Sequence, residues 1–305
     1  MSRTLLLSSA AFSWREWLKE NRKQRDLACL DPSDPAQSPP GKLTLFHGSK
    51  PAYWRFYGSL DPARAPHVLV AALAQMLPIA GDDAIIQLFP ARNTPLLRQL
   101  IQVCCQLVQP KEILTPKGAG LDLEGLPIGP EEMEIEAAFP VMVQQAQRKA
   151  QWMKLIETCT EQEIDLRRVS IEGARLGSSE ALHPDLLVKA GLTGAHHAEV
   201  AGGTLLLITD EEPEEHVIAR ALDICHASRA TVLNPASYDN LLCSFARQNG
   251  EDFGFGIVKE IDFKLGVATI FSTAVPPAPV RILRLGGLRV EATGRELTEA
   301  RPWQL

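Results

Sequence analysis

The first 116 residues alternate short apolar runs with longer segments of helical periodicity. The apolar runs are typical of buried strands, and the segments between them place apolar residues three and four positions apart. This alternation is typical of a parallel sheet whose crossover helices cover its faces. We expect strands at 4–7, 27–30, 43–46, 84–88 and 113–115, and helices at 15–24, 66–77 and 95–108.

The turn between the first strand and the first helix is the place where many α/β proteins bind a phosphate. The strand ends at Leu7, and Trp14, Trp17 and Leu18 mark the helix by their i, i+3, i+4 spacing. A loop of the form G-x-x-x-x-G-K-[ST] fills this turn in nucleotide-binding proteins. Neither glycine, nor the lysine, nor the Mg²⁺-binding hydroxyl is in place here, because the turn reads Ser8-Ser9-Ala10-Ala11-Phe12-Ser13-Trp14-Arg15.

The segment after the second expected strand carries Asp34, Gln37 and the run Pro39-Pro40-Gly41, followed by a strand at 43–45. This order resembles a loop of the polynucleotide 5′-hydroxyl kinase family, the P-loop RNA kinases of pre-mRNA cleavage and ribosomal RNA processing. In that family the loop reads roughly D-x-D-x-G-Q, followed by P-P-G and a strand. The family's glycine is Ala36 here, and its first aspartate is displaced or lost.

Further segments follow in the order that this family requires. Residues 56–62 resemble an F-x-G-x-x-S-P stretch, and 84–107 resemble a strand, a glycine-rich loop and a helix, although 90–94 contain no glycine. The most specific match lies near the C-terminus. Residues 253–263 resemble a strand of the form G-x-G-I-V-x-x-I-D, and 280–297 resemble a V-R-x-L-R-L-G-x-L-R ending.

The resemblance implies an α/β fold, a P-loop-NTPase-like parallel sheet flanked by helices, in residues 1–235, and a small C-terminal β domain in 236–305. It places Asp34 and Gln37 where the family holds a carboxylate near Mg²⁺ or the attacking hydroxyl. It places Arg148 at the approximate position of the lid arginines. Residues 34–41 also fit a plain turn, and the residues around Arg148 also fit a solvated helix face. For each segment the functional and the purely structural interpretation remain open.

Phosphoryl transfer by this fold depends on groups that the turn lacks. Glycines let backbone N–H groups turn inward, a lysine neutralises the phosphates, and a hydroxyl holds Mg²⁺. Trp14 stands at the lysine position and is bulky enough to fill the phosphate site. Ser8 and Ser13 carry Cβ atoms that disfavour positive φ, and Ser9 and Arg15 complete the degenerate slot. We therefore expect no cofactor and no metal site.

Composition agrees with a globular chain. With 305 residues, 45% of them hydrophobic and 22% charged, a substantial core is expected, and no run approaches the ~18 apolar residues that a membrane span needs. The first residues lack the pattern of a secretory signal, so we expect a cytoplasmic or nuclear protein without membrane association. The six cysteines form no C-x-x-C pair and fit buried free thiols.

The net charge of −6 argues against a protein that coats nucleic acid electrostatically. Basic clusters occur locally at 15–25 and at 148–168. Such clusters can contact single-stranded RNA, and they are also typical of solvated helix faces.

Two functions from different classes remain open. The first is a catalytically degenerate relative of the kinases that acts as a binding or scaffolding module in RNA processing, with a protein partner and single-stranded RNA as a further candidate partner. The second is an active ATP-dependent nucleotide or polynucleotide kinase that uses ATP and Mg²⁺ through an unorthodox serine-rich loop, aided by Arg15, Arg92 or Arg148. Trp14 is the residue that distinguishes the two functions, because a bulky side chain at the lysine position favours the non-catalytic module.

Overall fold

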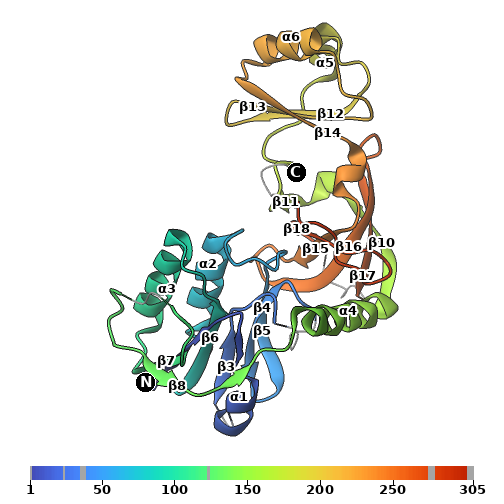
Figure 1. The fold of residues 1–305 in the computed structure, drawn as a ribbon. Helices are drawn as coiled ribbons and strands as arrows, with labels where there is room; N and C mark the ends of the chain where they lie inside the picture. Colours follow the sequence, from blue (N-terminus) through green and yellow to red (C-terminus); the bar gives the residue numbers. More distant parts are fainter. Residues whose placement is uncertain (1, 23–24, 35–38, 122–123, 274–278, 301–305) are drawn as a thin grey trace. The chain divides into compact units, whose positions relative to one another are not determined.

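A computed structural model describes the protein at residues 2–22, 25–34, 39–121, 124–273 and 279–300. Within it the chain divides into two compact units, which we call unit 1 (Met1–Gln151) and unit 2 (Trp152–Leu305). Their helices and strands are labelled in Figure 1.

A sheet of seven strands, counted over the described residues, forms the centre of unit 1 (Figure 1). In sheet order the strands are β5 (Lys50–Phe56), β4 (Lys42–His47), β3 (Asp26–Cys29), β6 (Ala84–Pro90), β1 (Thr4–Ser8), β7 (Glu112–Pro116) and β8 (Glu131–Met133). The last five are parallel to one another, whereas β4 and β5 are antiparallel to their neighbours.

Helices cover both faces of this sheet. Leu5 and Leu7 of β1 belong to the larger core, which also includes residues of α2 (Pro66–Met76) and α3 (Pro95–Val108). Leu6 points to the opposite face, into a smaller cluster to which α1 (Arg15–Asn21) contributes. Alternate residues of a strand face opposite sides, so both faces of a central strand are apolar when both are covered. The predicted α/β architecture, a parallel sheet flanked by helices, is confirmed.

The local signals that start and stop helices are visible in α3. Its N-cap is Thr94, whose hydroxyl accepts a 3.4 Å hydrogen bond from the Leu97 N–H, and Pro95 opens the first turn. The helix ends before Gln109, which adopts a left-handed conformation. The predicted helix at 95–108 is confirmed to the residue, and the one at 66–77 to within one residue.

Unit 2 contains a sheet of six strands within the described residues. β11 pairs parallel with its neighbour, and the remaining pairs are antiparallel. This sheet takes strands from both sides of residue 235, where the sequence analysis places a domain boundary. In sheet order they are β10 (Cys159–Asp165), β17 (Val267–Thr273), β16 (Asp252–Asp262), β15 (Leu241–Ala246), β18 (Ile282–Arg289) and β11 (Ser170–Glu172).

A smaller sheet of three strands, β12 (Ala195–Ala201), β13 (Thr204–Thr209) and β14 (Arg229–Leu233), completes unit 2 with α5 (Pro184–Ala190) and α6 (Glu215–Cys225). The central strand β13 serves two cores. Leu206 and Ile208 pack with residues of the six-stranded sheet, whereas Leu205 and Leu207 pack with residues of the two helices. The apolar run of β13 is therefore buried on both faces.

Close packing explains one glycine in the most specific sequence match. A Cβ atom on Gly256 of β16 would lie 2.7 Å from the Phe271 carbonyl oxygen and 2.8 Å from Cγ2 of Ile270, both on β17. Real Cβ atoms do not approach other atoms so closely. The G-x-G pattern at 254–256 thus reflects a close approach within the sheet rather than a turn.

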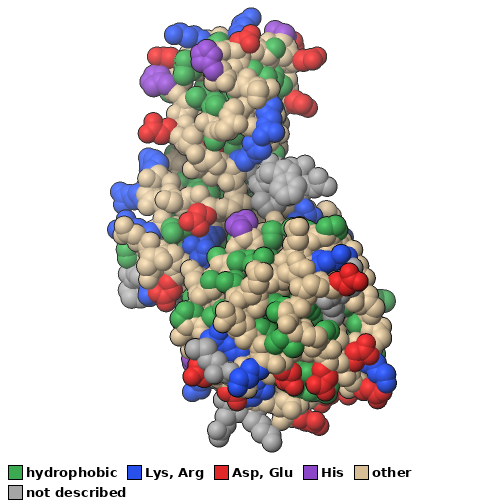
Figure 2. Space-filling view, turned by 90° about the vertical axis from the view of Figure 1, so that its left-hand side faces the viewer, with side chains coloured by type: hydrophobic (Ala, Val, Ile, Leu, Met, Phe, Trp, Pro, Cys, Tyr) green, Lys and Arg blue, Asp and Glu red, His purple; other side chains and the backbone are tan. Residues whose placement is uncertain are grey.

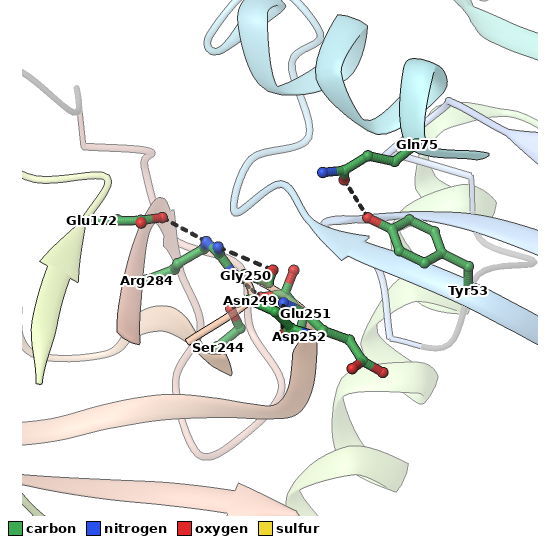
Figure 3. A network of polar contacts seen from close by, with 9 residues as sticks. All are labelled: Tyr53, Gln75, Glu172, Ser244, Asn249, Gly250, Glu251, Asp252 and Arg284. Atoms are coloured by element: carbon green, nitrogen blue, oxygen red, sulfur yellow. Dashed lines mark hydrogen bonds and ion pairs between the residues drawn. The ribbon is translucent and has the colours of Figure 1, made fainter. Parts of the chain in front are cut away.

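A buried ion pair links three segments of the six-stranded sheet (Figure 3). The Arg284 guanidinium of β18 donates to Asp252 of β16 and, at 2.8 Å, to Glu172 of β11. Asp252 also accepts a 2.8 Å hydrogen bond from the Ser244 hydroxyl of β15. Arg284 and Asp252 are both buried, so each of these charges is compensated by its partners within the network rather than by water.

No helix in the described part of the chain combines the length and apolar character needed to cross a membrane. On the face that Figure 2 shows, Lys and Arg side chains are interspersed with Asp and Glu side chains rather than joined in a continuous stripe.

Candidate functional site

The turn that follows β1 is a short, hydrogen-bonded structure rather than a wide loop. The Phe12 N–H donates to the Ser9 carbonyl at 3.2 Å, which closes a tight turn. Directly afterwards β2 (Phe12–Ser13) pairs antiparallel with β9 (Glu136–Ala137). The backbone of the second half of the turn therefore pairs with another strand, whereas a phosphate-binding loop directs its N–H groups inward.

Trp14 is buried in this turn, with 2% of its surface exposed. Its indole N–H donates to the Leu7 carbonyl at 3.1 Å, and its ring meets Trp17 edge-to-face at 5.6 Å between centroids. The ring packs with residues of four parallel strands, among them Leu6 and Ile85. The indole is thus a core side chain with its polar atom satisfied.

The other residues of the slot make local contacts. The Ser9 hydroxyl oxygen accepts from the Ala11 N–H, and that of Ser13 accepts from the Arg15 N–H. The Arg15 guanidinium lies 5.6 Å from the centroid of the Phe139 ring. The Ser8 hydroxyl is buried and has no hydrogen-bond partner within the described residues. None of these contacts forms an inward-facing ring of donors.

An acidic pair lies at the carboxyl end of β3. Asp31 is 7% exposed, and its carboxylate accepts hydrogen bonds from the Ser33 N–H at 2.9 Å and the Ser33 hydroxyl at 2.7 Å. Asp34 accepts a 3.4 Å hydrogen bond from the side-chain amide of Gln87 on β6, and the Cys29 Sγ lies 3.7 Å from the same oxygen. The ends of neighbouring strands β3 and β6 are therefore joined through Asp34.

The positive charge of a helix residue, Arg148, acts on Asp31. Burial, together with the nearby Asp34 charge, raises the pKa of Asp31 to about 7, opposed by the Ser33 hydrogen bonds and by the positive charge of Arg148. Arg148 is on α4 (Val141–Thr158), and 9% of its surface is exposed. The structure therefore places Arg148 near the acidic pair, so Asp31, Asp34 and Arg148 form one cluster.

The cluster and the slot share an edge of the sheet. β1 and β3 both pair with β6, and parallel neighbours end on the same side. This edge is where ligands bind in open α/β sheets. Gln37 lies outside the described residues, and its position relative to the cluster stays a prediction. Among the described side chains, no group of three or more His, Cys, Asp or Glu is arranged to hold a metal ion.

Sequence reasoning did not select Asp31, a member of the cluster, or Gln87, which bonds to Asp34. Asp31 directly follows an expected strand, which is a usable signal because ligand-binding residues often occupy that position. The resemblance directs attention to Asp34 instead, because the family's first aspartate falls at Pro32. Asp31 precedes that position by one residue, as the displaced aspartate would. Gln87 lies inside a strand and carries no comparable signal.

No protein-family model and no curated protein matches this chain. Solved structures do match. One is a complex of wild-type Clp1p with Pcf11p, with a TM-score of 0.54 and 12% identity over 94% of this chain and 74% of the matched chain. Another concerns the extended interface between Pcf11p and Clp1p and the basis of ATP loss in a point mutant, with a TM-score of 0.52 and 12% identity over 94% and 75%.

The chain has a Clp1p-like fold. At 12% identity this likeness establishes the fold and leaves the chemistry to the residues of the site. The resemblance to the P-loop kinases seen in the sequence therefore agrees with the fold of solved structures.

Proposed function

We propose that this protein is a catalytically degenerate relative of the polynucleotide 5′-hydroxyl kinases that acts as a binding or scaffolding module for a protein partner in RNA processing. The observation that carries the proposal is the burial of Trp14 in the slot. An indole bonded to the Leu7 carbonyl occupies the turn in which the related fold requires glycines and a lysine.

The residues of the slot do not fit a triphosphate. A phosphate-binding loop supplies inward N–H groups, a cation and a metal-binding hydroxyl. This turn instead pairs with β9, and Ser9 and Ser13 bond to neighbouring N–H groups. Binding of ATP would require the buried Trp14 ring to leave its core, at a cost of about 3–5 kcal/mol for a large aromatic side chain.

The structures with a similar fold support a role in protein binding. Their solved structures hold Clp1p together with Pcf11p, so a chain with this fold forms a stable complex with another protein. A protein of this fold can lose phosphoryl transfer and still bind a protein partner, because a fold does not determine the chemistry of its site. Single-stranded RNA is a further candidate partner, in keeping with the kinase family that the sequence resembles.

The cluster of Asp31, Asp34 and Arg148 favours a second candidate, an ATP-dependent polynucleotide kinase with an unorthodox loop. Carboxylates near an attacking hydroxyl and an arginine over the transferred phosphate are parts that phosphoryl transfer uses. These side chains lie at the edge of the sheet where that chemistry would take place. The candidate requires ATP and Mg²⁺ to bind without the usual cradle.

A transfer assay separates the two candidates. Purified protein is incubated with Mg²⁺, γ-labelled ATP and a single-stranded RNA bearing a 5′-hydroxyl, beside an active polynucleotide kinase as a positive control. We expect no label on the RNA above background. Label that disappears in Asp34→Asn and persists in Trp14→Phe would establish the second candidate and overturn the first.

A further inference from the structure

An open hollow on the surface of unit 2, which we call the basic pocket, has no part in the proposed nucleotide chemistry; the side chains of Arg167 and Arg168 that line it are 72% and 83% exposed. Its volume is about 440 Å³. Three arginines line it together with two polar and two apolar side chains, and these residues are Arg167, Arg168, Arg281, Ser170, Gln248, Val169 and Ile282. The pocket joins a turn of 3-10 helix at Leu166–Arg168 to the ends of three sheet strands.

The backbone beneath the pocket is fixed by the sheet. The Arg281 N–H donates to the Ala246 carbonyl at the end of β15, at 3.1 Å, and the Arg281 carbonyl accepts from the Ser170 N–H at the start of β11, at 2.9 Å. The side chain of Arg167 packs against Gly266, whose Cβ position would lie 3.6 Å from the Arg167 Cγ. The arginines therefore project from ordered backbone and not from a long free loop.

The pocket has an excess of positive charge. Asp165 pairs with both Arg167, at 2.8 Å and 3.1 Å, and Arg168, at 3.3 Å. Arg281 makes no ion pair within the described residues. Three guanidinium groups and one carboxylate leave a local charge of 3 − 1 = +2.

Three acidic residues close to the lining along the chain bond to other arginines. Glu172 and Asp252 both bond to Arg284, as Figure 3 shows, and Glu251 pairs with Arg247 at 3.1 Å. These contacts leave the excess charge of the pocket unneutralised by those carboxylates. An anion of matching charge is the ligand that such a pocket favours.

The chemistry of the lining selects among anions. Guanidinium groups bind phosphate oxygens through paired hydrogen bonds, and a phosphate monoester carries a charge of roughly −1.5 to −2 near neutral pH. Proteins that bind single-stranded nucleic acid combine basic groups with aromatic platforms for the bases. None of the residues that line the pocket is aromatic, and Ile282 supplies an aliphatic wall. The lining therefore favours a single phosphate on a peptide over an RNA strand.

We propose that the basic pocket binds a phosphorylated serine or threonine of a protein partner. Arg281 and Arg168 hold the phosphate oxygens, Arg167 with Asp165 fixes the orientation of the site, and Ser170 and Gln248 supply further donors. The inference does not depend on the fate of the nucleotide slot, because every residue of the pocket belongs to unit 2.

The test is a titration of the full chain with a peptide of alternating Gly and Ser that carries one phosphoserine, followed through the arginine Nε–Hε resonances in NMR. Unphosphorylated peptide and a 5′-phosphorylated oligouridylate are titrated in parallel. We expect the phosphopeptide to shift the Nε–Hε resonances of Arg281, Arg167 and Arg168. We expect the unphosphorylated peptide to leave them in place.

Charge reversal locates the site. Arg281→Glu and Arg168→Glu are each expected to weaken phosphopeptide binding about 10-fold or more, because each replaces a charged hydrogen-bond donor with a carboxylate that repels the phosphate. Arg220→Glu, an equal charge change at an exposed position of α6, is the matched control and should bind within about twofold of wild type. Melting curves verify that all three variants fold.

Three outcomes would overturn the proposal. The phosphopeptide leaves the three resonances unmoved, or Arg220→Glu weakens binding as much as the pocket variants do. Alternatively the oligouridylate binds more tightly than the phosphopeptide and loses affinity in the same variants, which would assign the pocket to nucleic acid.

Discussion

The indole N–H of Trp14 donates a 3.1 Å hydrogen bond to the main-chain carbonyl of Leu7, and so ties the start of α1 to the end of β1. In a phosphate-binding loop the space between the end of the strand and the start of the helix is occupied by glycine backbone and a bound anion. In this protein the Trp14 side chain occupies that space. The contact makes the turn part of the core, so its loss should appear as a change in stability.

Replacing Trp14 with alanine should destabilise the protein by about 3–5 kcal/mol, because a buried aromatic ring is lost and a cavity is left. Trp14→Phe keeps most of the ring and removes the N–H, so it should cost less, with about 1 kcal/mol assigned to the hydrogen bond. Urea unfolding measures both. Trp17→Ala, at a partly exposed position, is the control and should cost less than Trp14→Ala. Equal stability of Trp14→Ala and wild type would contradict the packing described for the slot.

The raised pKa of Asp31 predicts a pH dependence of stability. The folded state holds this proton up to about pH 7, whereas the unfolded state releases it near pH 4, so the folded state binds more protons between these values. The Asp31 contribution therefore favours folding at low pH and is progressively lost as the pH rises from about 4 to about 7. A tenfold difference in proton affinity between the two states corresponds to about 1.4 kcal/mol.

Asp31→Asn should remove this dependence. The free energy of unfolding of wild type minus that of the variant should fall between pH 4 and pH 7 and level off above it. Asp165→Asn should give a dependence of the opposite sign at lower pH, because hydrogen bonding from Arg167 lowers the pKa of Asp165; its contribution is fully present above about pH 4 and is lost as the pH falls further. A wild-type minus Asp31→Asn difference that stays flat across the same range would show that Asp31 titrates normally.

Gly256→Ala should destabilise unit 2 by about 1–3 kcal/mol, because the added methyl group would overlap the Phe271 carbonyl and the neighbouring strand β17 leaves no space for it. Gly194→Ala, at a glycine with open space around its Cβ position, should change stability by less than about 0.5 kcal/mol. Thermal unfolding of the two variants beside wild type provides the comparison. Similar melting temperatures for both would rule out the close approach in β16.

Arg284→Ala should cost about 3–5 kcal/mol, because it removes one partner of a buried ion pair with the Asp252 carboxylate. Arg247→Ala breaks an exposed pair with Glu251 and should cost about 0–1 kcal/mol. Denaturant titrations of the two alanine variants distinguish a buried network from a surface pair. The prediction fails if the two substitutions have the same effect.

Continuous apolar runs made four of the five parallel strands of unit 1, namely β1, β3, β6 and β7, predictable from the sequence, whereas the short, acidic β8 was not expected. The edge strand β5 was not, because Lys50–Phe56 contains a proline and polar residues, and its pairing with β4 determines its conformation. β10 was missed for a related reason. The sequence Cys159–Asp165 is mostly polar and follows α4 directly, and it becomes a strand through its register with β17, far away in the sequence.

The site was predictable in part. The absence of a phosphate-binding loop and the position of Trp14 are visible in the residues themselves, because the turn is local. The cluster of Asp31, Asp34 and Arg148, with Gln87 bonded to Asp34, is not local, since it joins a strand end, a neighbouring strand and a distant helix. Burial of Asp31 depends on that assembly, and no pattern within residues 26–41 indicates it.

Titration with ATP and Mg²⁺ tests the central claim most directly, with the melting temperature of the full chain as the readout. A nucleotide present at about 100 times its Kd stabilises a folded protein by about 2.7 kcal/mol, which raises the melting temperature by several degrees. With Trp14 filling the slot, we predict no change in melting temperature up to millimolar ATP–Mg²⁺. A rise in the melting temperature of the wild-type protein that is lost in Asp34→Asn would contradict the account.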